Sequence, residues 1–350
     1  MSVRKVLILE AQTPFVHGGA EILVRQLAGA LRERGFEADI ASIPFRDDPR
    51  EELMAHAAAW RLVDVSQSLG HSIDLAIATK FPTYFVRHPV KVAWLVHQHR
   101  AAYELCGTPF SNFEHSEQDV GLRKRLIELD TQMLGECTRL FAIARTVSAR
   151  LEKFNGLTAE PLYHPPKLAR QLKPGPYGDY MLTVTRLEHV KRVDLAIDAF
   201  VHVDRRLRLV IAGDGSARQR LEERIEQNGL RQRVTLLGRV SDEQIVDLYA
   251  GARGVLFAPY DEDYGYVTLE AFLARKPVVT AADSGGTLEF VIDGTNGFVT
   301  APSGEAIAEA INKLAGDTRL AASLGENGHD RARAVTWDGV VEKLVEAARH

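Results

Sequence analysis

The sequence has few cysteines and no long hydrophobic run. Cys106 and Cys137 are its only cysteines, and they form neither a Cys-x-x-Cys pair nor a disulfide framework, which fits a reducing compartment. No stretch approaches the roughly 18 apolar residues that a membrane-spanning helix needs. The segment Met1–Glu10 carries charge and runs directly into a predicted strand, so we expect no secretory signal. The expected location is the cytoplasm, with contact to the inner face of a membrane left open.

An excess of positive charge and a dinucleotide-binding fingerprint are also missing. The formal net charge is −4 at pH 7, which argues against a general nucleic-acid binder. Gly18-Gly19 and Gly213-Asp214-Gly215 lie at predicted turns between a strand and a helix. Neither forms Gly-x-Gly-x-x-Gly followed by an acid about 20 residues later. An NAD-dependent oxidoreductase is therefore a weak alternative.

Short apolar runs alternate with segments of helical periodicity along the whole chain. This alternation predicts an α/β protein with two doubly wound, Rossmann-like halves and mostly parallel sheets. A proline-rich segment near the middle divides them. We expect a first domain over residues 1–165, a linker over 166–178, a second domain over 179–335 and a final helix over 336–350. From the family resemblance given below, this final helix is expected to return to the first domain. The cleft between the halves is the natural ligand site, because ligands bind beyond the carboxyl ends of parallel strands.

The expected elements follow from these runs. The predicted strands are 6–9, 38–41, 74–78, 92–96, 139–143, 180–184, 207–212, 234–237, 254–258 and 277–280. Predicted helices cover 21–34, 121–136 and 267–274, and others begin near 192, 217 and 242, followed by a helical tail.

One predicted strand-to-helix connection in the second half carries two carboxylates, Glu262 and Glu270. Between them, Tyr264-Gly265-Tyr266 forms a loop at a helix start, where unpaired backbone N–H groups favour a phosphate or a sugar hydroxyl. Two carboxylates would repel a phosphate, so they fit better as acceptors for hydroxyl groups. A first-turn acid favoured by the helix dipole and a solvated loop acid would explain the same two residues.

Cations that could meet a diphosphate occur on a neighbouring predicted loop. Arg186 lies just past a strand, and Lys191 lies at the start of the next helix. A guanidinium fork and an ammonium group suit a diphosphate, although ordinary solvated charges in a turn remain an alternative. Gly213 and Gly238 follow the next two strands and fit loops of the same crevice, although glycine in such turns is usually structural.

Two features of the first half point to a similar crevice. Gly18-Gly19 precedes a predicted helix and would let a phosphate or a sugar approach the backbone, although a plain tight turn is the simpler explanation. His97 follows a strand that ends at Val96, and the His-x-His spacing would place His97 and His99 on one face. No third ligand at metal spacing accompanies them, so we expect a hydrogen-bonded histidine at the cleft and no metal site.

Taken together, these segments resemble the retaining glycosyltransferases of the GT-B fold, specifically glycosyltransferase family 4. That family is marked by two glutamates with seven residues between them, which stand here in EDYGYVTLEAFLARKPVV from Glu262 to Val279. The resemblance extends to Gly18-Gly19, His97, TRLEHVKRVDLAIDAF, IAGDG, LLGRVSDEQIVDLYAGA and SGGTLEFVIDGTNGFV. It spans most of the chain and is closest over residues 180–300. Arg275 replaces a glycine that is usual in the family, which affects only a predicted turn at a helix C-terminus.

The resemblance implies roles for the candidate residues. Glu270 would hold ribose hydroxyls, and Glu262 would contact hydroxyls of the transferred sugar. Arg186 and Lys191 would bind the diphosphate and stabilise it as the leaving group, while His97 would face the reacting centre. Two protein cations would then carry the electrostatic role of a metal, and no cofactor is expected. The remaining implied donor-binding positions are Gly18, Gly19, Gly213, Gly238, Tyr264, Gly265, Tyr266 and Val267.

The resemblance also implies the classes of substrate. The donor would be a GDP-sugar or a UDP-sugar, and the Glu-Asp-Tyr-Gly form of the motif tilts this toward GDP-mannose. The acceptor would be a hydroxyl of a glycan or of its lipid-linked precursor. Arg25, Arg32, Arg34 and Arg123-Lys124-Arg125 could meet an anionic lipid surface, or form a solvated helix face. A non-catalytic nucleotide-sugar-binding protein and the sugar-nucleotide epimerases of the same fold remain alternatives.

Overall fold

The computed structural model describes residues 3–15 and 18–348, which form two compact units. The first unit combines Met1–His164 with Thr336–His350, and the second unit is Pro165–Val335. Each unit contains one six-stranded sheet whose neighbouring strands all pair in parallel. Two doubly wound α/β units were expected from the alternation of strands and helices, and the structure confirms them.

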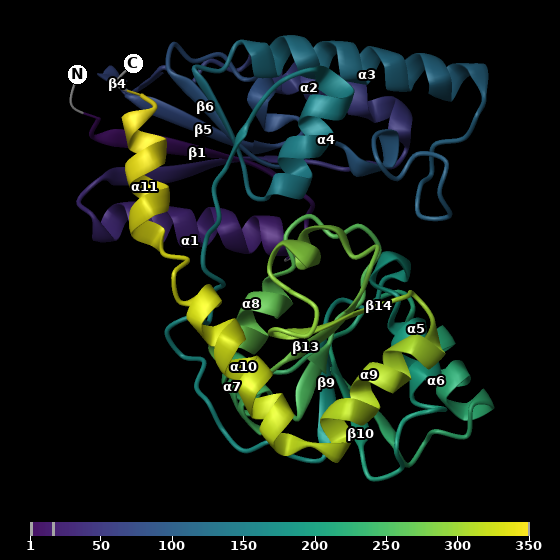
Figure 1. Ribbon diagram of the computed structural model, residues 1–350. Coiled ribbons are helices and arrows are strands. Elements are labelled where there is room, and N and C mark those ends of the chain that lie inside the picture. The colour runs from purple at the N-terminus through teal and green to yellow at the C-terminus, as the bar shows by residue number, and fades with distance from the viewer. Residues whose placement is uncertain (1–2, 16–17, 349–350) are drawn as a thin grey trace. The chain divides into compact units, whose positions relative to one another are not determined.

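The sheet of the first unit has the strand order β2-β1-β5-β6-β7-β8. Its strands are β1 (Lys5–Gln12), β2 (Glu37–Pro44), β5 (Leu75–Lys80), β6 (Lys91–His97), β7 (Arg139–Ala142) and β8 (Glu160–Pro161), and a separate hairpin joins β3 (Gln67–Ser68) to β4 (His71–Ser72). Its helices are α1 (Gly19–Glu33), α2 (Leu53–Leu62), α3 (Glu117–Gly135), α4 (Arg145–Asn155) and α11 (Trp337–Glu346). Helices α1 and α11 cover one face of the sheet, and α2, α3 and α4 cover the other (Figure 1).

Helix α1 shows why the sequence folds in this way. Its buried residues include Leu23, Val24, Leu27 and Leu31, whose spacing of three and four residues places them on the side that packs on the sheet. Strands β5 and β6 are buried along nearly their whole length, as expected when helices cover both faces of a parallel sheet.

The C-terminal helix α11 belongs to the first unit, as expected. The Trp337 ring meets the Trp94 ring of β6 edge-on, with 6.2 Å between centroids. Asp338 pairs with Arg34 at the end of α1, and Lys343 pairs with Glu160 of β8. The C-terminal helix therefore packs on the unit that also contains the N-terminal part of the chain.

The sheet of the second unit has the strand order β11-β10-β9-β12-β13-β14. Its strands are β9 (Tyr180–Val184), β10 (Arg208–Ala212), β11 (Val234–Gly238), β12 (Gly254–Leu256), β13 (Val278–Ala281) and β14 (Gly297–Thr300). Its helices are α5 (Val193–Ala199), α6 (Arg218–Gln227), α7 (Asp242–Gly251), α8 (Tyr266–Leu273), α9 (Gly304–Gly316) and α10 (Thr318–Ala332). Helices α5, α6 and α9 lie on one face, and α7, α8 and α10 lie on the other (Figure 1).

The segment expected to be a linker packs within the second unit. The buried Lys276 ammonium donates to the carbonyls of Gly175 and Pro176, both at 2.9 Å, and lies 4.1 Å from the centre of the Tyr177 ring. The Tyr177 hydroxyl donates to the carbonyl of Arg275 at 2.7 Å. These contacts attach residues 175–177 to the turn that precedes β13.

The predicted strands all occur, with ends shifted by a few residues. Helices α2 and α4, the hairpin β3–β4 and strands β8 and β14 were not among the predicted elements. Strands β8 and β14 are short and pair at the sheet edge, where few apolar residues are needed. The apolar and alanine residues of α2 do not follow one clear stripe, so periodicity gives little signal there.

Candidate functional site

In the second unit, the site is built where the order of strands reverses. Strand β9 pairs with β10 on one side and with β12 on the other. The chain moves from β9 toward β10 and β11, then crosses back to β12 and continues outward. The loops after β9 and β12 therefore diverge at the carboxyl edge of the sheet, the position at which doubly wound folds bind ligands. These two loops carry Arg186, Lys191 and Glu262.

Lys191 and Glu262 form an ion pair between these two loops. The Lys191 ammonium lies 2.5 Å from the Glu262 carboxylate, and both side chains are largely buried, at 13% and 16% exposure. Arg186 is exposed, and within the described residues its side chain makes no hydrogen bond or ion pair. The structure thus brings two of the predicted site residues, Lys191 and Glu262, into contact, whereas the Arg186 side chain faces solvent.

The loop that carries Glu262 contacts two other loops, the one that follows β9 and the one that follows β13. The amide of Tyr260 donates to the carbonyl of Val190 at 2.9 Å, and the amide of Gly286 donates to the carbonyl of Glu262 at 2.7 Å. A Cβ atom at Gly286 would lie only 2.4 Å from the carbonyl oxygen of Asp263. Glycine is needed here because a side chain would push the two loops apart.

The entrance of α8 follows the loop that carries Glu262. Gly265 has a left-handed backbone with φ 79°, and a Cβ atom there would lie 2.8 Å from the Thr287 hydroxyl. The buried ring of Tyr264 packs against Tyr266, with 5.2 Å between centroids. The amides of Gly265 and Val267 have no acceptor among the described residues. Unpaired amides at a helix start favour a negatively charged ligand.

Glu270 occupies a different environment from Glu262. It is partly buried on α8, and the hydroxyl of the fully buried Tyr249 on α7 donates to its carboxylate at 2.8 Å. Burial raises the pKa of Glu270, and the Tyr249 hydrogen bond opposes this effect. The two glutamates of the motif are therefore distinguished by their partners, an ammonium group for Glu262 and a neutral hydroxyl for Glu270.

Gly213 and Gly238 join two loops at the same edge of the sheet. They form an antiparallel bridge in which the Gly213 amide donates to the Gly238 carbonyl at 2.8 Å. Gly213 has φ 141°, and a Cβ atom there would lie 1.8 Å from the carbonyl oxygen of Thr185. This contact holds the loop after β10 against the loop that begins before Arg186, so the glycine has a structural role at the edge of the site.

In the first unit, Gly18 and His97 also lie at the carboxyl edge of the sheet. Gly18 precedes α1, and its amide donates to the Glu21 carboxylate at 2.8 Å. Lys80, at the end of β5, pairs with Glu21 at 2.7 Å and lies in register with His97 at the end of β6. Gly19 begins α1. Val16 and His17, which precede these glycines, lie outside the described residues.

Lys80 was not among the predicted site residues. It follows the predicted strand 74–78 by two residues, and a position just past a strand is the signal that could have identified it. Because Lys80 pairs with Glu21, it connects the Gly18 turn to the strand that neighbours His97.

The two histidines of the His-x-His pair have separate environments. His97 is partly buried, and its Nδ1 donates to the Gln98 carbonyl at 2.6 Å. His99 is buried between the rings of Phe81 and Phe113, at 5.9 and 6.0 Å between centroids. Burial lowers the pKa of His99 to about 4, so its ring is neutral at physiological pH. These contacts give His99 a place in an aromatic cluster.

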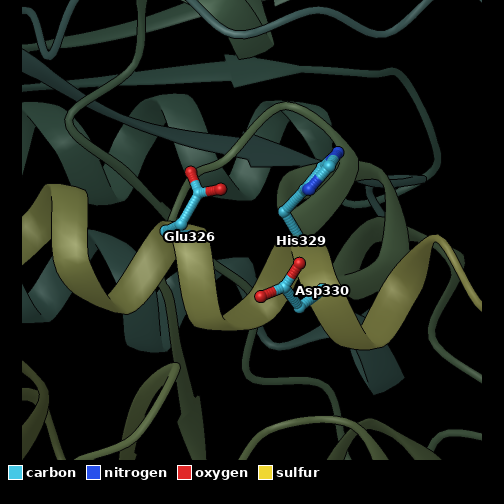
Figure 2. A group of neighbouring side chains, drawn as sticks. All are labelled: Glu326, His329 and Asp330. Carbon is cyan, nitrogen blue, oxygen red and sulfur yellow. The ribbon is translucent and has the colours of Figure 1, made fainter.

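Three side chains with metal-ligating atoms meet elsewhere in the second unit. Figure 2 shows Glu326, His329 and Asp330 on α10, and their ligand atoms lie within 4.8 Å of one another. Glu326 pairs with Arg275 and Asp330 pairs with Arg333, each at 3.1 Å. Both carboxylates are exposed and already have cationic partners, so we assign no function to this cluster.

The arginines expected to meet a lipid surface are largely engaged within the first unit. Arg25 pairs with Glu10 at 2.8 Å, and Arg34 pairs with Asp338. Arg123 donates to a backbone carbonyl at 2.6 Å. None of the helices in the described part of the chain combines the length and apolar character that crossing a bilayer requires.

Comparison with known proteins finds similarity to a described family in the second unit. Residues 167–331 match the family described as glycosyl transferases group 1. The human alpha-1,3/1,6-mannosyltransferase ALG2 is 32% identical over 169 residues, which are 44% of this chain and 40% of that protein. The alpha-D-kanosaminyltransferase of Streptomyces kanamyceticus is 37% identical over 151 residues, 42% of this chain and 39% of that protein. The chain thus spans about two fifths of the length of these curated relatives.

Solved structures resemble the whole chain. Sucrose-phosphate synthase from Thermosynechococcus elongatus matches with a TM-score of 0.76 at 19% identity, covering 99% of this chain and 98% of the other. HepE of Anabaena, described in complex with UDP and glucose, matches with a TM-score of 0.72 at 19% identity, covering 98% of each chain. The fold is accordingly GT-B, as expected. Within this fold, most of the second unit, residues 167–331, is similar to the glycosyl transferases of group 1.

Proposed function

We propose that this protein transfers a hexose from a nucleoside-diphosphate sugar to a hydroxyl group of a glycan or lipid-linked acceptor. The observation that supports the proposal is the contact of Lys191 with Glu262 at the strand-order reversal of the second unit. Arg186 lies on the loop of Lys191, and Glu270 lies on the helix that follows Glu262. Cations, carboxylates and helix-entrance amides at one edge of a sheet suit a ligand with a diphosphate between two hydroxyl-rich sugars.

Each group has a chemical task in this proposal. Arg186 and Lys191 bind the diphosphate and stabilise the charge that develops as it leaves, a role that a metal has in other enzymes. Glu262 accepts hydroxyls of the transferred sugar, Glu270 accepts ribose hydroxyls, and His97 faces the reacting centre. The acceptor oxygen forms a bond to the anomeric carbon while the bond to the diphosphate breaks, and the acceptor proton passes to the departing phosphate oxygen. Front-face attack of this kind retains the anomeric configuration.

The donor and acceptor are proposed more specifically from similarity. The human relative is named a mannosyltransferase, which supports a GDP-mannose donor, whereas HepE is described with UDP and glucose, which supports a UDP-sugar. We propose a cytoplasmic protein that acts on a surface glycan or its lipid-linked precursor at the inner face of a membrane. Equal activity on a soluble, lipid-free sugar, together with no binding to anionic liposomes, would contradict the membrane part of the proposal.

The deciding experiment has two stages. Thermal unfolding is followed with UDP, GDP and ADP, because a ligand at 100 times its dissociation constant adds about 2.7 kcal/mol of stability. Sugar nucleotides that contain the same base as the stabilising nucleotide are then tested for consumption in the presence of glycan and lipid-linked acceptors. If no nucleotide shifts the melting curve, the transferase proposal fails. Stabilisation without turnover on any acceptor would favour a nucleotide-sugar-binding protein instead.

A further inference from the structure

Arg192, which directly follows Lys191, has a left-handed backbone. Its φ and ψ are 49° and 44°, a conformation that residues with a Cβ atom rarely adopt. Such a backbone persists only where its surroundings hold it in place, and it often marks a functional site. The contacts of Arg192 identify those surroundings.

The guanidinium group of Arg192 is bound by two other loops of the site. Its Nε donates to the carbonyl of Ala258 at 2.9 Å, and its Nη2 donates to the carbonyl of Pro259 at 2.8 Å. Nη1 and Nη2 form a two-pronged ion pair with the carboxylate of Asp283, at 2.8 and 2.6 Å. The guanidinium also lies over the Tyr260 ring, 5.7 Å from its centre. Only 14% of the Arg192 side chain is exposed.

These partners surround the Lys191–Glu262 ion pair. Arg192 is the chain neighbour of Lys191, and Pro259 lies three residues before Glu262. Asp283 lies on the loop that follows β13, and its carbonyl accepts from the amide of Asp261, the residue before Glu262. One side chain therefore connects the loops that follow β9, β12 and β13 at the point where two candidate catalytic groups meet.

We propose that Arg192 is a positioning residue of the donor site, which holds the Lys191 ammonium and the Glu262 carboxylate where one nucleotide-sugar meets both. This inference rests on the proposed function and adds to it a residue that would not itself touch the donor. It acts through the ion pair, because its four hydrogen bonds fix the two loops from which Lys191 and Glu262 project. A misplacement of about 1 Å at a reacting centre can lower a rate by about 100-fold.

Lysine cannot replace arginine in this role. The guanidinium has five N–H donors in a planar fork, and four hydrogen bonds to three residues match that geometry. An ammonium group has three donors and cannot bind Asp283 in a two-pronged manner while also reaching both carbonyls. Arg192→Lys and Asp283→Asn therefore both weaken the ion pair between residues 192 and 283, each by changing one of its two partners.

The first test measures kinetics. We expect Arg192→Lys and Asp283→Asn each to lower kcat by about 10-fold to 100-fold, with a change in donor KM below about 3-fold. In a Lys191→Ala background, Arg192→Lys should cause a smaller further loss than in wild type, because only Glu262 is then left for it to position. The matched control is Arg208→Lys. Nη2 of Arg208 also donates to both carboxylate oxygens of an aspartate, Asp179, at 2.8 and 3.1 Å, but Arg208 lies at the amino end of β10. A raised KM at unchanged kcat, or losses that multiply, would overturn the role.

The second test does not need turnover. Acetylation of Lys191 by acetic anhydride is followed by mass spectrometry, relative to the exposed Lys124. Because Lys191 is held in an ion pair, we expect Arg192→Lys to raise its relative labelling rate at least about 3-fold. An unchanged rate would overturn the positioning role. A wild-type protein without transferase activity but with this labelling change would refute the proposed function and still support the connection.

Discussion

Replacing Glu270 with glutamine should stabilise the protein at neutral pH while it weakens nucleotide binding. The Glu270 carboxylate accepts one hydrogen bond, from the Tyr249 hydroxyl at 2.8 Å, and has no ion-pair partner among the described residues. When Glu270 ionises, a charge that has lost much of its water is compensated by a single neutral donor. Glutamine keeps the acceptor for Tyr249 and removes the charge. We expect a gain of about 1 kcal/mol at pH 8, typical when a functional charge is neutralised.

The sign of the pH dependence follows from the pKa of Glu270. Burial raises this pKa in the folded protein above its ordinary value of 4.5. The folded state therefore binds the proton more tightly than the unfolded state. This contribution to stability is complete below pH 4.5 and is lost as the pH rises through the raised pKa. The stability difference between Glu270→Gln and wild type should grow as the pH rises, because the glutamine variant does not titrate.

Thermal and urea unfolding between pH 4.5 and pH 8.5 measure this difference. A gain of about 1 kcal/mol corresponds to a rise in Tm of roughly 2–4 °C for a unit of this size. Glu309→Gln is the matched control, because Glu309 is exposed on α9 and should show no such trend. UDP and GDP should stabilise Glu270→Gln less than wild type. A variant that is no more stable at pH 8, or a stability difference independent of pH, would refute the account of Glu270.

Three further changes test other parts of the site. Glu262→Ala should lower the rate of transfer by about 100-fold or more but preserve binding of the nucleoside diphosphate, because the change frees Lys191. Binding is measured by calorimetry, and equal losses of transfer and binding would contradict the assigned role. Arg275→Gly should raise stability by about 0.5–1 kcal/mol in urea unfolding, since Arg275 has φ 57° at the end of α8, where glycine is favoured. A lower stability would show that the ion pair of the partly buried Arg275 with Glu326 matters more. Gly213→Ala should lower the free energy of unfolding by more than about 2 kcal/mol, because its Cβ would strike the backbone carbonyl of Thr185. Gly316→Ala is the control and should be tolerated, because the space around Gly316 is open. Equal melting curves of the two variants would contradict the predicted clash at Gly213.

The turn at Arg275 illustrates what the family pattern could and could not reveal. The family usually has glycine there, and the substitution was expected to affect only a helix C-terminal turn. The structure confirms that turn: the amide of Lys276 donates to the carbonyl of Ala271 at 2.8 Å, and the amide of Arg275 donates to that of Phe272 at 2.9 Å. The pattern did not reveal that Lys276 is buried against residues 175–177, because those residues are about 100 positions away.

Several properties of the protein were determined by its sequence alone. Apolar runs of four to six residues between helical segments can be buried only as strands covered on both faces, so the two parallel sheets follow from the alternation. Positions just after such strands meet at one edge of a sheet, so Arg186, Lys191 and Glu262 were identifiable as site candidates from local order. Glu270 could be placed in the first turns of a helix by the same reasoning.

Only the tertiary structure decided which of these residues are partners. Lys191 and Glu262 are 71 positions apart, and they meet because β12 crosses back to pair with β9, an order of strands that local patterns do not specify. The same crossing brings Ala258 and Pro259 to Arg192, and the neighbouring strand β13 brings Asp283. Such contacts depend on which strands become neighbours, and that choice is made by packing of the whole sheet rather than by any one segment.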